Sequence, residues 1–426
     1  MIIRNFKSLS TTSAKKDALS IIEAGLEAAL PKNQLEKIIK YDYLNVCGKK
    51  IDLKKYDRVF VIAVGKSAYS MTEAVNSLTV ISGGLLVVPK KTKTALTGKF
   101  KVIHAGHPVP NKNSVIAAKN ILGFLGKTKP RDFIIFLISG GASSLVALPD
   151  GITLGEKQMV TDLMLKCGAN IHEINCIRKH LSQIKGGRLL EHLRSNAISL
   201  VMSDVVGDDL SSIASGITYY DKTTFFDAKK ILKKYHLERS IPKSVLVHME
   251  LGLKGKIPET PKREKIQNHI ISTNKNCLDA MNVHAKDLGF STKILSCISG
   301  DVKDLGMKIA KTFSCKKIDC VIFGGEPTVV VKGKGRGGRN QELVLHTAID
   351  LAKQNMHAIV VSVGTDGIDG TTGCAGAIWQ SDNKIDQIKP YLDKNNSYNF
   401  FKKYGGLVFT GPTGTNLMDI GLVLGQ

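Results

Sequence analysis

Short apolar runs rich in Val, Ile and Leu recur along the chain, and most of them end in glycine or another turn residue. They are unbroken rather than alternating, and they lie at 58–65, 84–89, 132–141, 197–204, 269–274, 320–327 with 328–333, and 357–367. Unbroken runs of this length are typical of strands buried on both faces of a parallel sheet. Segments with helical periodicity lie between most of these runs. The pattern therefore predicts a layered α/β fold, with a Rossmann-like, parallel-rich sheet in the amino-terminal part.

The first helical pattern lies near the amino terminus. Apolar residues between Ala18 and Leu30 recur with the spacing of one helix face. Ser13 is a candidate cap for this helix, and Pro31 is expected to end it.

A change of composition indicates where the chain divides. The segment from about 240 to 266 is rich in proline, lysine and arginine, as exposed linkers are. We therefore expect two α/β domains, an amino-terminal one over 1–245 and a smaller carboxyl-terminal one over 267–426, joined by 246–266. Because open α/β sheets bind ligands at the carboxyl ends of their strands, the active site is expected in a cleft between the domains.

The charge of the chain raises the question of a polyanionic partner. Lys and Arg number 60 against 37 Asp and Glu, a formal charge of +23. The basic residues are spread along the chain, however, and no RNP, zinc-finger or helix-turn-helix pattern accompanies them. We therefore expect small-molecule substrates and no nucleic acid. Homo-oligomerisation stays open.

Other classes of protein are disfavoured by simple patterns. No run of about 18 apolar residues and no signal-peptide pattern occurs, which predicts no membrane span and a cytoplasmic protein. The eight cysteines are scattered, and in a chain of this length we expect buried thiols. Cys315 and Cys320 are the closest pair, but nothing nearby completes a zinc site.

A glycine-rich loop follows the apolar run that begins at Asp132. A strand that stops at paired glycines leaves several backbone N–H groups for phosphate or carboxylate oxygens. The loop is SGGASS at 139–144, and its candidate nucleotide-binding residues are Ser139, Gly140, Gly141, Ser143 and Ser144. An ordinary tight turn is the alternative, and the density of Gly and Ser favours phosphate binding.

A second apolar run ends in VGKSA at 64–68. This is not a Walker A motif, because position 60 is Phe where that motif needs glycine. Lys66 nevertheless follows a buried strand at the edge where ligands bind.

A third loop, GKGRGG at 333–338, fits the G-x-G-x-x-G pattern of dinucleotide-binding proteins. The acidic residue that binds the ribose is expected about 20 residues later. The first candidate is Asp366, well beyond that spacing, and three basic residues lie in or beside the loop. The match taken alone is therefore weak.

Carboxylates also follow predicted strands, notably Asp204, Glu326 and Asp366. Phosphoryl transfer needs one or two carboxylates to hold a divalent cation, as well as cations on the phosphoryl group. Helix capping is the alternative for each aspartate. His104 and His107 could ligate a metal, but no third ligand follows at a known spacing.

Together these motifs resemble one family, the glycerate 2-kinases, whose carboxyl-terminal part is called the MOFRL domain. The resemblance runs in order through VFVIAVGKSA (59–68), FLISGGASSLVALPDGI (136–152), EINCIRKHLSQIKGGRLL (173–190), SLVMSDVVGDDLSSIASG (199–216), GGEPTVVVKGKGRGGRNQEL (324–343), VSVGTDGIDGTTGCAGAI (361–378) and GPTGTNLMDI (411–420). GGRNQE and TDGIDG are its most specific parts.

The resemblance implies transfer of the γ-phosphoryl group of ATP to the 2-hydroxyl of D-glycerate, with a divalent metal ion, normally Mg²⁺. It also implies that Lys66 and Arg339 are functionally critical. These two cations would bind the glycerate carboxylate and the moving phosphoryl group. The residue after the lysine is commonly alanine in the family and is Ser67 here.

Four further residues receive expected roles in this interpretation. Glu326 and Asn416 are expected to bind substrate. Asp204 and Asp366 are expected to place the metal ion or to orient the attacking hydroxyl. SGGASS would hold the nucleotide phosphates.

An NAD(P)H-dependent oxidoreductase of the hydroxypyruvate reductase type is the alternative. Relatives of this family often carry that label, and GKGRGG resembles a dinucleotide-binding loop.

Overall fold

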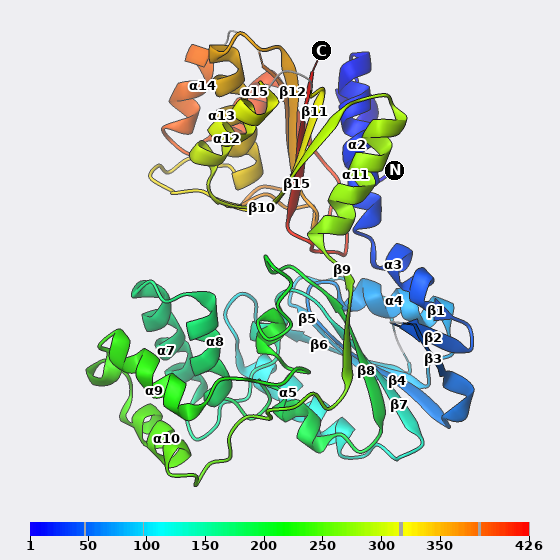
Figure 1. Ribbon diagram of the computed structural model, residues 1–426, viewed down its shortest axis with the longest axis vertical. Helices are drawn as coiled ribbons and strands as arrows, with labels where there is room; N and C mark the ends of the chain where they lie inside the picture. The colour runs from blue at the N-terminus through cyan, green and yellow to red at the C-terminus, as the bar shows by residue number, and fades with distance from the viewer. Residues whose placement is uncertain (47, 97, 315–317, 382–384, 426) are drawn as a thin grey trace. The chain divides into compact units, whose positions relative to one another are not determined.

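The computed structural model describes residues 1–46, 48–96, 98–314, 318–381 and 385–425. The chain forms two compact units, which are coloured by residue number in Figure 1. Unit 1 combines Met1–Gln34 with Ser272–Gln426, and unit 2 is Leu35–Ile271. The mixed α/β class predicted from the apolar runs is confirmed.

Unit 2 is built on a six-stranded sheet whose strands follow the order β6-β5-β4-β7-β8-β9. Their bounds are Phe100–Ala105, Gly83–Pro89, Arg58–Val64, Asp132–Ile138, Asn196–Met202 and Gln267–Ser272. All neighbours from β6 to β8 pair in parallel. Every residue of β7 is buried, because its unbroken apolar run lies between two layers of helices and loops.

The helices of unit 2 form two groups. The helices α4 and α5 pack against the strands, and α7 to α10 form a separate cluster with its own core (Figure 1). The bounds are Ala68–Leu78 for α4, Lys112–Leu125 for α5, Ala142–Leu145 for the short α6, Leu154–Lys166 for α7, Ile171–His180 for α8, Phe225–Lys234 for α9 and Lys243–Leu253 for α10. A small antiparallel sheet contains β1, β2 and β3, at Ile39–Lys40, Tyr43–Val46 and Lys49–Asp52.

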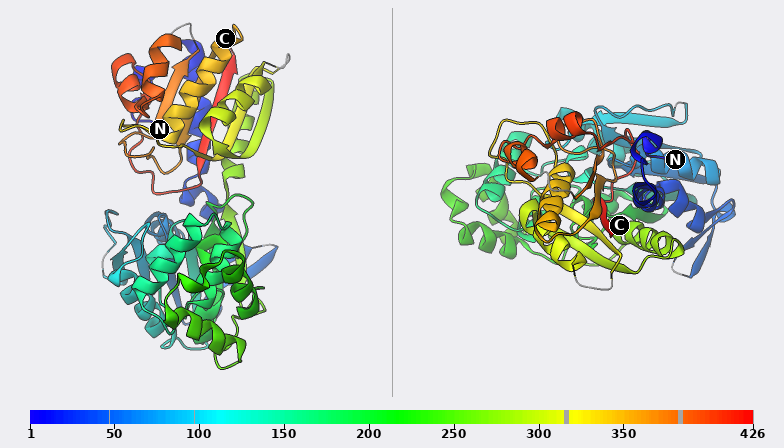
Figure 2. Two further views of the ribbon diagram at one scale, coloured as in Figure 1. Left: turned by 90° about the vertical axis from the view of Figure 1, so that its left-hand side faces the viewer. Right: turned by 90° about the horizontal axis from the view of Figure 1, so that it is seen from above.

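Unit 1 has a mixed sheet in the order β10-β11-β15-β12-β13-β14. The bounds are Thr292–Asp301, Cys320–Thr328, Asp419–Gly425, Ala358–Gly364, Gly376–Gln380 and Leu407–Val408. Only the β10 and β11 pair is parallel among these described strands. The red strand β15, the last described element of the chain, lies inside this sheet (Figure 2).

The helices of unit 1 cover both faces of its sheet. On one face α2 packs beside α11, and on the other α12 and α13 lie with α14 and α15 (Figure 1). The bounds are Phe6–Leu9 for α1, Ser13–Ala28 for α2, Asn274–Asp287 for α11, Val302–Phe313 for α12, Arg339–Lys353 for α13, Ile385–Leu392 for α14 and Ser397–Tyr404 for α15.

The division into units differs from the expected domain boundaries at both ends. A Cβ atom at Gly25 of α2 would lie 2.7 Å from Met281 of α11 and 2.9 Å from Ile420 of β15. This close approach attaches the amino-terminal segment to unit 1. The segment expected as a linker contains most of α10, whose Val245 and Met249 are buried. Apolar residues at helical spacing therefore outweigh the local proline and charge density.

Two local expectations are also corrected. Thr12 rather than Ser13 caps α2, because its hydroxyl accepts the N–H of Lys15. The helix α2 ends at Ala28, ahead of Pro31 as expected, and Pro31 itself begins the next helix, α3 at Pro31–Ile38, which is a position where its missing N–H costs nothing. Of the two adjoining apolar runs expected as strands, 320–327 forms β11, which ends at Thr328, whereas the remainder of 328–333 is not a strand.

Of the cysteine pair noted above, Cys315 lies outside the described residues, and Cys320 is a buried thiol. Cys297 is the exposed exception among the described cysteines. None of the helices in the described ranges has the length and apolar character needed to cross a bilayer.

Candidate functional site

Unit 2 holds Lys66 at the carboxyl end of β4, beside the loop that follows β7. The N–H of Lys66 donates to the carbonyl of Gly140 at 2.8 Å. The next N–H, of Ser67, donates to Ser139 Oγ at 3.0 Å. Gly65 adopts a φ of +139°, and a Cβ atom there would lie 2.1 Å from Ser139 Oγ. The two strand ends are therefore joined by one backbone–backbone hydrogen bond and by one bond from a backbone N–H to the Ser139 hydroxyl, and these fix the backbone position of Lys66.

The glycine loop brings Lys66 together with a histidine. Gly141 has a φ of +83°, and a Cβ atom there would lie 2.8 Å from His107 Cδ2 and 3.4 Å from Lys66 Cγ. Only glycine leaves room for this approach. Burial and then the charge of Lys66 lower the pKa of His107, so its imidazole is neutral at neutral pH. From the sequence alone, His107 was considered as a metal ligand and rejected. The short HAGHP segment at 104–108 was the only sequence feature that drew attention to it.

The predicted nucleotide-binding residues of the loop differ in what their side chains do. Ser139 is fully buried and accepts a hydrogen bond from Ser67, as described above. Ser144 Oγ donates to the carbonyl of Gly141 at 3.1 Å. Ser143 Oγ lies 3.0 Å from Ser215 Oγ. The hydroxyls of Ser139 and Ser144 therefore shape the loop, and backbone groups are what the loop can offer to an anion.

Asp204 also belongs to unit 2. It is half-buried and follows β8, which ends at Met202 and pairs in parallel with β7. Parallel neighbours end at one edge of a sheet. Asp204 therefore lies at the same edge of the unit 2 sheet as Lys66 and the glycine loop.

In unit 1, Arg339 is the first residue of α13, and two carboxylates bind its guanidinium group. Its Nε lies 2.6 Å from Asp419 Oδ2, and its Nη2 donates to Asp419 Oδ1 at 3.2 Å. Nη1 donates to Glu326 Oε1 at 3.2 Å. Burial lowers the pKa of the Arg339 guanidinium, but Asp419 and Glu326 more than offset this, so the pKa is raised. Glu326, expected to bind substrate, is thus already an ion-pair partner.

Asp419 is the residue of this group that sequence reasoning missed. Burial raises its pKa to about 7, although the Arg339 charge opposes that rise. The register of β11 with β15 pairs Gly325 with Asp419, which places the carboxylate beside Glu326. Asp419 lies within GPTGTNLMDI, but that motif does not reveal its pairing with Arg339, which lies far away in the sequence.

Asp366 lies close to this ion pair. A Cβ atom at Gly364 would be 3.2 Å from Asp366 Oδ1 and 3.3 Å from Asp419 Oδ1. Asp366 Oδ1 accepts the N–H of Ile368 at 3.0 Å, which orients the half-buried carboxylate. Asn416 is buried in the segment that precedes β15. Unit 1 thus gathers carboxylates around a single arginine.

The structure shows why GKGRGG is not arranged as a dinucleotide-binding loop. A pyrophosphate would need the N–H groups at the start of α13. The N–H groups of Asn340 and Gln341 there each donate to the buried carboxylate of Asp369 at 3.0 Å. A Cβ atom at Gly338 would lie 2.2 Å from the same carboxylate. An internal anion therefore occupies the place that a bound pyrophosphate would take.

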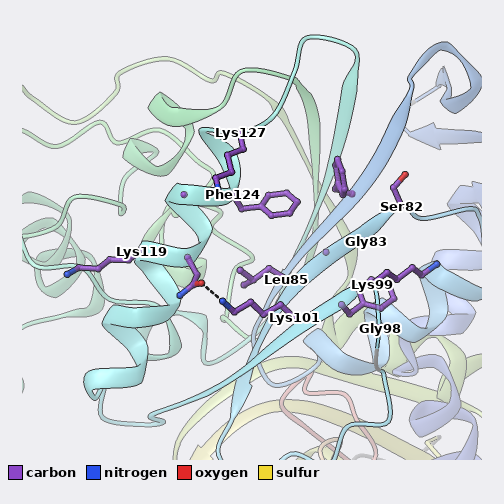
Figure 3. A pocket seen from close by; sticks show the side chains of 14 residues that line it. Ser82, Gly83, Leu85, Gly98, Lys99, Lys101, Lys119, Phe124 and Lys127 are labelled. Carbon is purple, nitrogen blue, oxygen red and sulfur yellow. Dashed lines mark hydrogen bonds between the residues drawn. The ribbon is translucent and has the colours of Figure 1, made fainter.

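A cavity of about 590 Å³ lies elsewhere in unit 2 (Figure 3). Gly83, Gly84 and Phe100 line it, at the amino ends of β5 and β6, with the side chains of Lys101 and Lys119 nearby. Lys66 and the glycine loop follow the opposite ends of the strands. This cavity is therefore separate from the candidate site.

No three His, Cys, Asp or Glu side chains within the described ranges gather in a way that could hold a metal ion. The predicted metal ligands belong to different units, Asp204 to unit 2 and Asp366 to unit 1. Each offers carboxylate oxygens, which are the ligand type that Mg²⁺ prefers.

Comparison with known proteins identifies the family of the chain. Residues 17–250 match the domain of unknown function DUF4147, and residues 319–419 match the MOFRL family. The glycerate 2-kinase of Pyrococcus horikoshii is 38% identical, over 94% of this chain and 95% of that protein. The chain belongs to the glycerate 2-kinase family.

Two further relatives extend the comparison within the glycerate 2-kinase family. The crystal structure of glycerate kinase from Thermotoga maritima has a TM-score of 0.84 and 36% identity, and it covers 97% of this chain and 100% of that one. A protein of Agrobacterium vitis with a provisional hydroxypyruvate reductase name is 36% identical over 86% of this chain. The glycerate kinases match over the greater share of this chain.

Proposed function

We propose that this protein transfers the γ-phosphoryl group of ATP to the 2-hydroxyl of D-glycerate, giving 2-phosphoglycerate and ADP. The observation that carries the proposal is the full-length similarity to glycerate 2-kinases. The side chains offered by the two units agree with it, because phosphoryl transfer relies on positioned cations and on carboxylates that hold a metal ion.

Each group would have a distinct task. Backbone N–H groups of the glycine loop would bind phosphate oxygens, and Lys66 would stabilise the charge that develops on the phosphoryl group. Arg339 would bind an anionic oxygen while Asp419 fixes its guanidinium plane. Glu326 would then help to position the Arg339 guanidinium group. Asn416 would position the segment that precedes β15.

A divalent cation, normally Mg²⁺, belongs to the proposal. Such an ion is commonly held by one or two carboxylates together with substrate phosphates, which suits Asp204 and Asp366. When bound, it would neutralise charge on the phosphates. The neutral imidazole of His107, next to Lys66, could accept a proton from a hydroxyl within hydrogen-bond reach.

Product analysis tests the proposal directly. The purified protein, supplied with D-glycerate, ATP and Mg²⁺, is expected to yield ADP and 2-phosphoglycerate, with the phosphate position fixed by NMR. A parallel reaction contains hydroxypyruvate and NADH without ATP. Oxidation of NADH together with no release of ADP would overturn the kinase proposal in favour of the oxidoreductase alternative.

A further inference from the structure

A second, smaller cavity of about 150 Å³ lies in unit 2 beside α8. His172, Asn175 and Lys179 line one wall, and their spacing of three and four residues places them on one face of the helix. The other wall contains parts of 209–212 and 219–223. The cavity thus collects side chains of EINCIRKHLSQIKGGRLL, a motif to which the proposed reaction assigns no role.

The lining contains polar side chains that are almost completely buried. The exposed fraction is 2% for Asn175, 3% for Lys179 and 1% for Asp221. Burying such groups is costly unless each finds a hydrogen-bond partner. The partners of each group therefore indicate what kind of ligand the cavity would accept.

The acceptors of the lining are already used within the protein. Asp221 Oδ1 accepts Lys179 Nζ at 3.2 Å and the N–H of Thr223 at 3.1 Å, and its Oδ2 accepts Thr260 Oγ1 at 3.1 Å. Asp209 accepts the N–H and hydroxyl of Ser211 as well as the hydroxyl of Ser212. These two carboxylates thus have their charge compensated by neighbouring donors.

Some hydrogen-bond donors of the lining, by contrast, are not fully used within the protein. Asn175 Nδ2 is buried and has no hydrogen-bond partner among the described residues. The ammonium group of Lys179 carries three N–H bonds, and Asp221 accounts for one of them. Lys222 adds an exposed positive charge to the lining. An occupant rich in acceptor oxygens would satisfy these groups.

The volume limits the size of such an occupant. A cavity of this volume holds a molecule of roughly the size of benzene. Inorganic phosphate and a three-carbon carboxylate are of this size, whereas a nucleotide is several times larger. The cavity is therefore too small to enclose a whole nucleotide.

The unpartnered amide is connected to the glycine loop. Ser215 Oγ donates to Asn175 Oδ1 at 3.0 Å and lies 3.0 Å from Ser143 Oγ. Ser215 has a φ of +55°, which is unfavourable for serine. It is held there because Gly186 donates its N–H to the Ser215 carbonyl and Lys185 Nζ donates to the neighbouring Ala214 carbonyl. A ligand on Asn175 would thus lie two hydrogen bonds from Ser143.

We propose that this cavity is a binding site for a small anion with phosphate or carboxylate oxygens, held by Asn175 Nδ2 and Lys179 and distinct from the Lys66 site. The ligand class follows from the surplus of buried donors, and the connection through Ser215 makes the glycine loop the element that its occupancy would influence. The inference does not depend on the proposed kinase activity.

Isothermal titration calorimetry of the whole protein tests the site, with inorganic phosphate and D-glycerate as separate probes. Asn175→Asp keeps the shape and the acceptor for Ser215, but it replaces the donor Nδ2 by a negatively charged oxygen. At least one probe is expected to bind the wild type and to bind Asn175→Asp at least ~10-fold more weakly. The matched control is Asn45→Asp on an exposed position of β2, which is expected to bind like the wild type.

Two further variants separate this site from the Lys66 site. Binding at the cavity is expected to persist in Lys66→Ala. Lys222→Met removes an exposed charge without disturbing buried groups, and it is expected to weaken binding several-fold even if Asn175→Asp proves unstable in thermal unfolding. The probe that binds identifies the source of the anion. Binding by neither probe up to ~10 mM, or binding lost in Lys66→Ala and kept in both Asn175→Asp and Lys222→Met, would overturn the proposal.

Discussion

Each unit contains one of the two candidate cationic residues, and the two residues are held in different ways. Lys66 in unit 2 is held through its main chain, whose N–H donates to Gly140. Arg339 in unit 1 is held through its side chain, by Asp419 and Glu326. The backbone hydrogen bond of Lys66 does not depend on its side chain, so it can persist when the side chain is removed. The Arg339 side chain, by contrast, neutralises a buried carboxylate, and its removal leaves that charge unpaired.

The largest expected effect is on turnover in Lys66→Ala. The main-chain hydrogen bonds of the glycine loop persist in this variant, but the ammonium charge of Lys66, proposed to stabilise the moving phosphoryl group, is lost. We expect kcat to fall by ~10³ or more, while the free energy of unfolding falls less than in Arg339→Ala, where a buried carboxylate loses its partner. Steady-state kinetics and urea unfolding measure the two quantities. Lys119→Ala, at an exposed position on α5, is the control. Near-normal turnover of Lys66→Ala would contradict the assigned role.

Arg339→Ala is expected to lower both turnover and stability. Asp419, which is 4% exposed, would lose its main partner, and we expect a loss of ~3 kcal/mol in the free energy of unfolding. The double variant Arg339→Ala/Asp419→Ala is expected to regain most of that stability and to remain inactive. If Arg339→Ala is as stable as Lys66→Ala, the contrast between the two units does not hold.

Unit 2 also contains a buried lysine that makes its stability depend on pH. Lys157 donates to the carbonyls of Leu181 and Arg178, and burial lowers its pKa to about 7. Because the unfolded chain binds this proton up to a pH near 10.5, the wild type should gain stability as pH rises above 7.

Lys157→Met tests this dependence. We expect the gain in unfolding free energy between pH 7 and pH 9 to be smaller in the variant by ~2 kcal/mol. Urea unfolding at the two pH values measures it, and the exposed Lys127→Met serves as control. Equal gains in the wild type and in Lys157→Met would show that the lysine is not neutral in the folded protein.

The smallest effect concerns Ser67. Its side chain is fully buried, and Oγ has no hydrogen-bond partner among the described residues. Replacing an unsatisfied hydroxyl by hydrogen removes a desolvation cost. Ser67→Ala is therefore expected to raise the free energy of unfolding by ~1 kcal/mol and to leave kcat unchanged, because the Ser67 N–H bond to Ser139 does not involve the side chain. A loss of stability would indicate an unseen partner for the hydroxyl.

Residues that act through the main chain could be predicted from sequence. The buried run that forms β7 and the glycine loop after it depend on local composition, and so does the position of Lys66 at a strand end. Asp419 depends instead on the register of β11 with β15, and the place of α2 depends on its contact with residues almost the whole chain away. Local patterns carry no information about such pairings.

His107 and the segment around Val245 illustrate the same limit. His107 matters because Gly141 lets it approach Lys66, and this is a contact between loops after different strands. Proline and lysine around Val245 indicate a linker locally, but the apolar side chains of α10 find their partners in α9. In both places the observed structure depends on tertiary packing, which the local composition does not reveal.

The position of β15 has a consequence for how the protein is made. This strand pairs with both β11 and β12, so the sheet of unit 1 remains split until residues 419–425 leave the ribosome. Unit 2 is complete in sequence by Ile271 and can fold much earlier during synthesis. Throughout that interval α2, which is synthesised before unit 2, lacks the strand β15 that it covers, and its apolar face is the surface that chaperones would meet.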